Sequence, residues 1–173
     1  MWEKTRRDLN AQLAGELEAA QQRLQGTVAQ LGARGSSVAL PLRPFQGALP
    51  WPAQGIVVGR FGRQTNNRFG TAISRSGIEI SLAEGQPVRA VHEGTIAFAD
   101  QFSGYGNLVI VDHGDGAYSL YGYLASLEAA RGAHVDPQAT VGAAGRDPSG
   151  NPALYFELRI DGKPVDPLQW LKR

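Results

Sequence analysis

The sequence contains no cysteine and has almost no net charge. With no Cys among its 173 residues, disulfides, thiolate nucleophiles and cysteine metal ligands are excluded. Its 17 Lys and Arg residues stand against 16 Asp and Glu residues, a net charge of +1. Proteins that bind nucleic acid usually carry a strongly basic face, so this balance argues against a nucleic-acid partner.

Long apolar runs are missing as well. A membrane-spanning helix needs about 18 or more consecutive apolar residues, and the sequence has no such run. The first residues, Met1-Trp2-Glu3-Lys4, do not resemble a secretory signal peptide. Two interpretations follow: the protein is cytosolic, or its export signal lies outside this sequence.

The N-terminal region, residues 1–31, is predicted to be a helix. Residues 3–31 contain no proline and are rich in Ala, Leu, Gln, Glu and Arg, which favour helices. Apolar residues recur at helical spacing and form one narrow stripe: Trp2, Leu9, Leu13, Leu17, Ala20, Leu24, Val28 and Leu31. Such a stripe is typical of a coiled-coil-like helix that pairs with another helix, and equally of one packed on its own domain.

The rest of the chain divides into a linker and a β-rich domain. Residues 32–48 are rich in Gly, Ser and Pro, which predicts a linker or a surface strap. Residues 49–173 contain short, often β-branched runs separated by Gly-rich turns, typical of a β-sandwich or an open barrel. The expected strands lie near residues 56–58, 78–80, 88–91, 95–99, 108–111, 118–123 and 154–160.

Common catalytic motifs are absent from the sequence. There is no Gly-x-Ser-x-Gly nucleophile elbow and no phosphate-binding glycine loop. His92, His113 and His134 stand alone, without another His at the short spacings of local metal sites. We therefore interpret all three as structural residues and expect no cofactor.

Four stretches, in order, resemble the LytM-type (lysostaphin-like) zinc endopeptidases. Residues 75–80 read Arg-Ser-Gly-Ile-Glu-Ile where the family has His-x-Gly-x-Asp. Residues 88–96 match a family strand pair, and 104–124 match a glycine-rich segment that runs into the family's Tyr-x-His-Leu. Residues 153–158 read Ala-Leu-Tyr-Phe-Glu-Leu where the family has His-Leu-His-Phe-Glu. The resemblance covers residues 49–173 and implies a lysostaphin-like, mainly β fold.

The same resemblance implies that the chain has lost the enzyme's chemistry. The family's zinc ligands fall at Arg75, Glu79 and Tyr155, and its two catalytic histidines fall at Tyr123 and Ala153. Only Glu79 could still ligate a metal, and an arginine or an alanine cannot act as a general base near neutral pH. The prediction is a degenerate domain with no catalytic residues and no metal.

The former cleft is predicted to survive as a partner-binding groove. Side chains alternate across a strand, so Ala153, Tyr155 and Glu157 share one face, and Tyr121 and Tyr123 are expected to share a face likewise. The predicted lining consists of Arg75, Glu79, Tyr121, Tyr123, Ala153, Tyr155 and Glu157. Tyr and Arg are enriched at binding hot spots. Tyr123 and Tyr155 should therefore point outward rather than into the core.

A helix before a degenerate LytM domain resembles the EnvC-like murein hydrolase activators. That resemblance implies a non-catalytic activator that binds a helix of a peptidoglycan amidase in the zinc-less groove during cell separation. It also implies a restraining segment that covers the groove until released. Peptidoglycan is a second expected partner, and a membrane-complex regulator bound through the N-terminal helix is a third. The expected location is the periplasm or cell envelope.

Two alternatives stay open on the sequence alone. The groove could bind peptidoglycan itself, as a cell-wall-binding module, or the domain could be a residual metallopeptidase with a displaced metal site. Metal analysis separates the second alternative from the others. A comparison of binding to an amidase with binding to purified cell wall separates the cell-wall-binding module from the activator.

Overall fold

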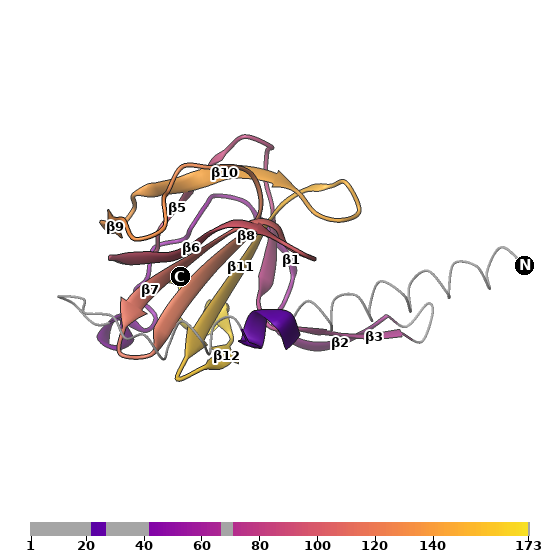
Figure 1. The fold of residues 1–173 in the computed structure, drawn as a ribbon. Coiled ribbons are helices and arrows are strands. Elements are labelled where there is room, and N and C mark those ends of the chain that lie inside the picture. The colour runs from indigo at the N-terminus through magenta and orange to yellow at the C-terminus, as the bar shows by residue number, and fades with distance from the viewer. Residues whose placement is uncertain (1–21, 27–41, 67–70, 173) are drawn as a thin grey trace, which may run out of the picture.

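The computed structural model describes residues 22–26, 42–66 and 71–172, and the side chains of residues 63–75 lie outside this description. The described part is mainly β, as the sequence predicts (Figure 1). Of the expected N-terminal helix, only residues 22–26 are described, and they are helical. The remainder, including most of the apolar stripe, lies outside the described residues. No helix in the described part is long and apolar enough to cross a membrane.

One ten-stranded sheet forms the body of the domain, and its main path runs β1-β4-β11-β10-β8-β7-β6-β9. These strands are β1 (Ile56–Gly59), β4 (Ile78–Ser81), β11 (Pro152–Ile160), β10 (Thr140–Arg146), β8 (Ala117–Leu127), β7 (Gly106–Gly114), β6 (Gly94–Phe102) and β9 (His134–Val135). Off this path, β12 (Lys163–Val165) pairs with β11, and β5 (Pro87–Arg89) pairs with β10. A separate hairpin joins β2 (Gly62–Asn66) to β3 (Thr71–Arg75).

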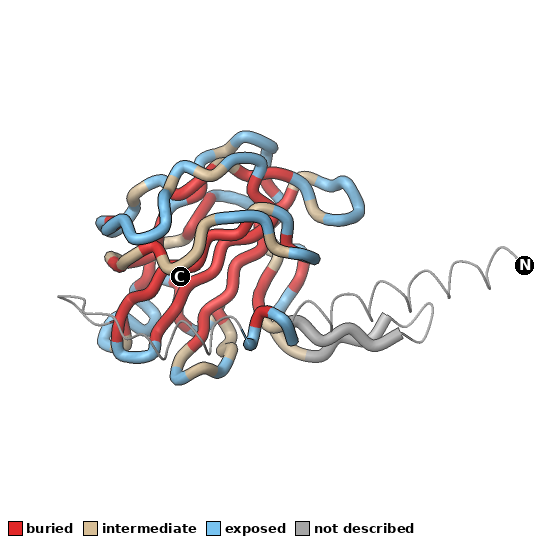
Figure 2. Tube along the Cα trace, viewed as in Figure 1, coloured by how far each residue is buried: buried red, intermediate tan, exposed pale blue. Residues whose placement is uncertain are grey.

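The sheet folds over itself into two layers. In Figure 1, β5, β9 and β10 lie above the strands β7, β8 and β11. The main core fills the space between the layers, where Val88, Val91 and Val141 pack with Val109, Tyr121 and Phe156. Figure 2 shows that the buried residues follow the central strands. Burial of one apolar face by the other layer is what makes the alternating strand pattern stable.

A chain of hydrogen bonds crosses one end of this core. The Val91 backbone N–H donates to the Tyr121 hydroxyl at 3.0 Å, and the hydroxyls of Tyr121 and Ser119 lie 2.8 Å apart. Ser119 Oγ lies 2.7 Å from His113 Nε2, and His113 Nδ1 lies 2.8 Å from the Glu93 carbonyl oxygen. Every partner is satisfied if the imidazole is neutral with its proton on Nδ1. Burial lowers the pKa of His113 to about 4, in agreement with that neutral form.

The histidines occupy structural positions in the described residues. The rings of His92 and His113 are tilted neighbours, with centroids 5.7 Å apart. His134 is exposed and lies 3.3 Å from Asp136. Within residues 22–26, 42–66 and 71–172, no group of three or more His, Asp or Glu side chains is placed to hold a metal ion.

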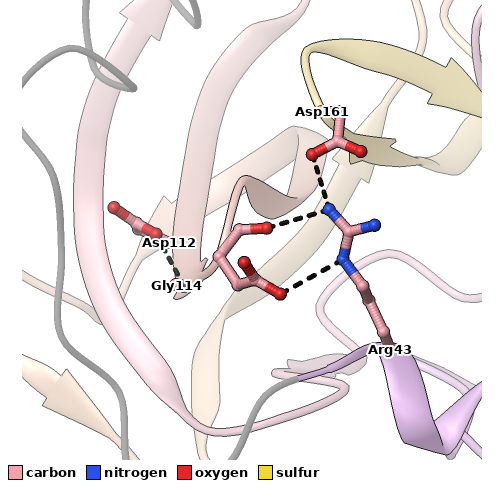
Figure 3. Close-up of polar contacts among 5 residues, drawn as sticks. Arg43, Asp112, Gly114 and Asp161 are labelled. Carbon is pink, nitrogen blue, oxygen red and sulfur yellow. Dashed lines mark hydrogen bonds and ion pairs between the residues drawn. The ribbon is translucent and has the colours of Figure 1, made fainter.

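The segment before the first strand forms a strap, residues 42–48, with η1 (Arg43–Phe45) in its middle. Leu42 is fully buried in the main core, and the Gly47 backbone N–H donates to the Trp170 carbonyl at 2.9 Å, beside η2 (Pro167–Gln169). The Arg43 guanidinium donates to Asp161 Oδ1 at 2.5 Å and to the Asp115 carbonyl at 3.1 Å (Figure 3). The strap thus fastens to two turns of the sheet.

Candidate functional site

The sheet carries a second apolar cluster on the face opposite the main core, which we call the tyrosine face. Its members are Tyr105, Leu108, Ile110, Tyr118, Leu120, Tyr123, Ala153 and Tyr155. Alternation along the strands builds it: on β7, Leu108 and Ile110 point to this face, while Val109 and Val111 point into the main core. The rings of Tyr105 and Tyr123 flank that of Tyr155, with centroid distances of 4.9 Å and 5.8 Å. This arrangement offers a continuous aromatic surface on a rigid sheet.

A bulge in β8 brings Tyr123 onto this face. Val109 pairs with Tyr121 and Asn107 pairs with Leu124, so Gly122 and Tyr123 together lie opposite the single residue Leu108. Tyr123 adopts a left-handed backbone conformation, with φ of 64°, and its N–H donates to the Tyr105 carbonyl at 2.7 Å. A non-glycine residue in this conformation costs of order 1–3 kcal/mol and persists where its surroundings demand it. The extra residue therefore switches which side chains face the core.

Because of this bulge, one residue that was predicted to line the groove lies in the main core. Tyr121 was expected to share a face with Tyr123, but it lies in the main core, fully buried, against Phe156 at a centroid distance of 5.4 Å. The prediction assumed unbroken alternation from residue 121 to residue 123. Because the left-handed residue breaks that alternation, Tyr121 belongs to the core hydrogen-bond chain and not to the groove.

The other predicted groove residues with described side chains do come together. Tyr155 on β11 pairs directly with Glu79 on β4, and Ala153 pairs with Ser81 two positions along. The Tyr123 hydroxyl donates to Glu79 Oε1 at 3.4 Å. Gly77 allows the chain before β4 to lie close to β11, because a Cβ there would lie 2.4 Å from the Phe156 carbonyl oxygen. Arg75 ends β3, and its side chain is outside the described residues.

A buried ion pair lies at one end of the tyrosine face. Glu157 accepts a hydrogen bond from the Tyr155 hydroxyl at 2.5 Å and pairs with the Arg159 guanidinium. Glu157 and Arg159 are both almost completely buried. Burial raises the pKa of the Glu157 carboxyl, while Arg159 acts in the opposite direction. The sequence analysis did not select Arg159, although its position two residues after Glu157 on the same strand face was a usable signal.

The helical turn at residues 22–26 covers this face. Leu24 is fully buried and belongs to the same cluster as the tyrosines. On either side of it, Arg23 donates to the Ser103 hydroxyl at 3.2 Å, and Gln25 donates to the Gly162 carbonyl at 3.1 Å. The Gln25 side-chain oxygen also accepts from Arg159. The turn therefore presents one apolar side chain to the rings and two polar ones to the rim.

The groove tyrosines point away from the main core but are less exposed than predicted. Tyr123 and Tyr155 leave the main core, yet they are only 5% and 2% exposed. Burial raises the pKa of both phenols well above the usual value, so both stay protonated at neutral pH. The face presents neutral rings and hydroxyl groups to whatever lies on it.

The described sheet and the matching sequence motifs place the chain in a class of mainly β, peptidase-like domains. The model of peptidase family M23 matches residues 74–167, and the chain belongs to that family. The fold is also shared with lysostaphin from Staphylococcus simulans, at 21% identity and a TM-score of 0.62, over 73% of this chain and 54% of that one. The lysostaphin-like fold predicted from the motifs is thereby confirmed.

Relatives within the family bear different names. The chain is 39% identical over 126 residues to the murein hydrolase activator EnvC of Escherichia coli, over 71% of this chain and 29% of the relative. It is 36% identical over 110 residues to the DD-carboxypeptidase/endopeptidase Mpg of Neisseria meningitidis, over 62% of this chain and 25% of the relative. The chain thus spans less than a third of the length of either relative.

The residues at the family's ligand positions do not fit a zinc ion. Zinc in catalytic sites takes three protein ligands, drawn from His, Cys, Asp and Glu. The resemblance of the sequence motifs assigns those positions to Arg75, Glu79 and Tyr155. Arg75 provides a permanent cation, and Tyr155 is a protonated phenol whose hydroxyl donates to Glu157. Glu79 alone, already in contact with the Tyr123 hydroxyl, is an insufficient set.

Proposed function

We propose that this domain is a non-catalytic activator of a peptidoglycan amidase and that the tyrosine face binds a helix of that amidase. The observation that carries the proposal is the burial of Leu24 among the tyrosine rings. A helical turn with one apolar side chain and flanking polar groups already fits this surface. An amphipathic helix from another protein can use the same features, since its apolar ridge packs on the rings and its polar residues contact the rim.

The residues 22–26 would then act as the restraining segment. Their contacts with Ser103, Arg159 and Gly162 hold Leu24 on the face, so an incoming helix has to displace them. Displacement of the turn leaves Arg159 without Gln25, and a carboxylate or amide of the amidase helix could replace it. This exchange would couple release of the restraint to partner binding.

Loss of catalysis in this proposal rests on the replaced residues. Without a ligand set for zinc, no Lewis acid polarises a scissile carbonyl and no bound water is activated. The similarity to a relative named murein hydrolase activator supports a regulatory role. The similarity to a relative named DD-carboxypeptidase/endopeptidase does not favour that role over catalysis. Direct binding of peptidoglycan on the tyrosine face is less well supported, because the tyrosines of that face are almost completely buried and its other members are Leu, Ile and Ala side chains.

A dye-release assay on purified sacculi tests the activator role. We expect no release by the domain alone and increased release when the domain is added to a cognate amidase. Tyr123→Ala and Tyr155→Ala should weaken amidase binding by more than about 1 kcal/mol each, as expected of hot-spot rings. Tyr155→Phe keeps the ring and should retain most of the activation.

Phe45→Ala provides a matched control, because Phe45 is a partly exposed ring that stacks on His92 instead of the tyrosine face. It should activate like the parent. Release by the pure domain that survives metal chelation would contradict the non-catalytic role. Folded Tyr123→Ala and Tyr155→Ala variants with parental activation would contradict the role of the face.

A further inference from the structure

A hollow of about 660 Å³ lies outside the tyrosine face. The segment 50–55, β5, the turn before β10 and Lys172 surround it. None of its lining residues belongs to the tyrosine face, so a ligand there would not compete with the turn at residues 22–26. Its volume is within the range of about 300–1,000 Å³ that is common for small-ligand sites.

The walls of this hollow are fixed by hydrogen bonds in the folded domain. The Trp51 indole N–H donates to the Lys172 carbonyl at 2.9 Å, which sets the orientation of the ring. The Gln86 side chain donates to the Gln54 carbonyl at 2.7 Å, and the Arg89 backbone N–H donates to the Pro52 carbonyl at 2.8 Å. A site held in this way needs little ordering when a ligand binds.

The lining combines one aromatic ring, several amides and two cations. Trp51 is half-buried, and Gln86 and Gln138 bring side-chain amides to the rim. The side chains of Arg89 and Lys172 are exposed, and no Asp or Glu is among the described residues that line the hollow. An anionic group that enters therefore meets two positive charges from this described lining.

These groups match the chemistry of a sugar with a carboxylate group attached close to it. The face of a sugar ring is weakly polar and packs against an indole, which offers a large, rigid apolar surface. Hydroxyl and acetamido groups exchange hydrogen bonds with side-chain amides. Carboxylates bind guanidinium and ammonium groups, with Arg providing a planar, two-pronged donor.

We propose that this hollow binds a saccharide whose attached peptide carries carboxylates. The natural source we assign, a peptidoglycan fragment with its disaccharide and acidic stem peptide, rests on the proposed function of the domain in the cell wall. Two contacts at separate places would let the domain hold the wall while the tyrosine face binds the amidase. Binding through exposed cations in a shallow site should weaken as salt is added.

Titration calorimetry with a purified disaccharide-tetrapeptide, released from sacculi by a muramidase, tests the site. The parent chain should bind it, and a neutral chitin tetrasaccharide should bind at least about tenfold more weakly, which corresponds to about 1.4 kcal/mol. The double variant Arg89→Gln/Lys172→Gln should lose the preference for the acidic ligand. Arg131→Gln, which removes an exposed cation that does not line the hollow, should bind like the parent.

Trp51→Ala should also weaken binding about tenfold or more, and Trp51→Phe should restore most of it, since a ring remains for the sugar to pack on. Absence of binding by the parent would overturn the proposal. Equal affinity for the acidic and neutral sugars, or unchanged affinity in the double variant, would also overturn it. So would equal affinity for the free stem peptide, because the sugar would then contribute nothing.

The same variants separate this site from the proposed activator role. Arg89→Gln/Lys172→Gln should bind and activate the amidase in solution like the parent, because neither residue lies on the tyrosine face. If the parent binds the saccharide and fails to activate any amidase, the activator role fails and the hollow stands. If activation is retained and saccharide binding is absent, only the hollow fails.

Discussion

Both faces of the central sheet carry buried apolar side chains, but different parts of the chain cover them. The main core is covered by a second layer of strands from the same sheet, and it includes a complete chain of hydrogen bonds from Val91 to Glu93. The tyrosine face is covered, among the described residues, by a helical turn that contributes one leucine. A turn that contributes one apolar side chain can be exchanged at far lower cost than a layer of the sheet. The difference separates residues that hold the fold from residues available to a partner.

Substitutions on the two faces of β11 should differ most in their effect on the free energy of unfolding. Phe156 points into the main core and Tyr155 onto the tyrosine face. Phe156→Ala should lower the free energy of unfolding by about 3–5 kcal/mol, since it leaves a cavity that the two layers cannot close. Urea unfolding measures this, and the refolded variant should still activate an amidase. A loss below about 1 kcal/mol would show that the core face is less tightly packed than described.

Acid should weaken the main core through His113. Its pKa is lowered to about 4 in the folded state from the ordinary value of 6.5, so between these pH values the unfolded chain takes up a proton that the folded chain refuses. Stability from this residue is complete above about pH 6.5 and is lost as the pH falls to about 4, by about 3 kcal/mol. Glu157, whose pKa is raised, acts in the opposite direction.

The contribution of His113 is obtained by comparing two variants. His113→Gln should flatten the fall in stability between pH 6.5 and 4. His134→Gln is the control, since it replaces an exposed histidine outside the core hydrogen-bond chain. Chemical unfolding at a series of pH values gives both slopes. Parallel slopes for the two variants would mean that His113 is not the acid-sensitive group.

The strap should give the smallest effect. Arg43 makes ion pairs with Asp115 and Asp161 at 3.3 Å and 2.5 Å, but all three side chains are substantially exposed. Exposed pairs contribute about 0.2–1 kcal/mol, so Arg43→Ala should lower stability by no more than about 1 kcal/mol. High salt should remove most of the difference between Arg43→Ala and the parent. A larger loss would indicate that the ion pairs of Arg43 contribute more than exposed pairs ordinarily do.

The sequence predicts the fold well and the site in part, and the residues explain why. Alternating apolar positions such as Leu154, Phe156 and Leu158 are enough to predict which face of β11 packs in the main core, because a regular strand has a period of two. Tyr121 was assigned wrongly since a bulge that depends on tertiary contacts changes the alternation before Tyr123. No local sequence pattern predicts this bulge.

Two further features depend on contacts between distant parts of the chain. The cover by Leu24 joins residues more than 80 positions apart, and its helical stripe alone predicts a buried side without saying against what. The hollow beside Trp51 likewise forms from the segment 50–55, β5 and Lys172, which no motif links. The division into a helix over 1–31, a linker over 32–48 and a domain over 49–173 stays a prediction, as does the groove role of Arg75.

The affinity of the full chain for its amidase, measured for the parent and for Leu24→Glu, tests the central claim most directly. A glutamate cannot remain among the tyrosine rings without burying an unpaired charge, so the turn should leave the face. We expect Leu24→Glu to bind the amidase at least about tenfold more tightly and to activate it more strongly, because the restraining turn no longer competes. Gln22→Glu, which adds the same charge at an exposed position of the turn, should bind like the parent. Unchanged or weaker binding by a folded Leu24→Glu variant would contradict the claim that the turn and the amidase helix share the tyrosine face.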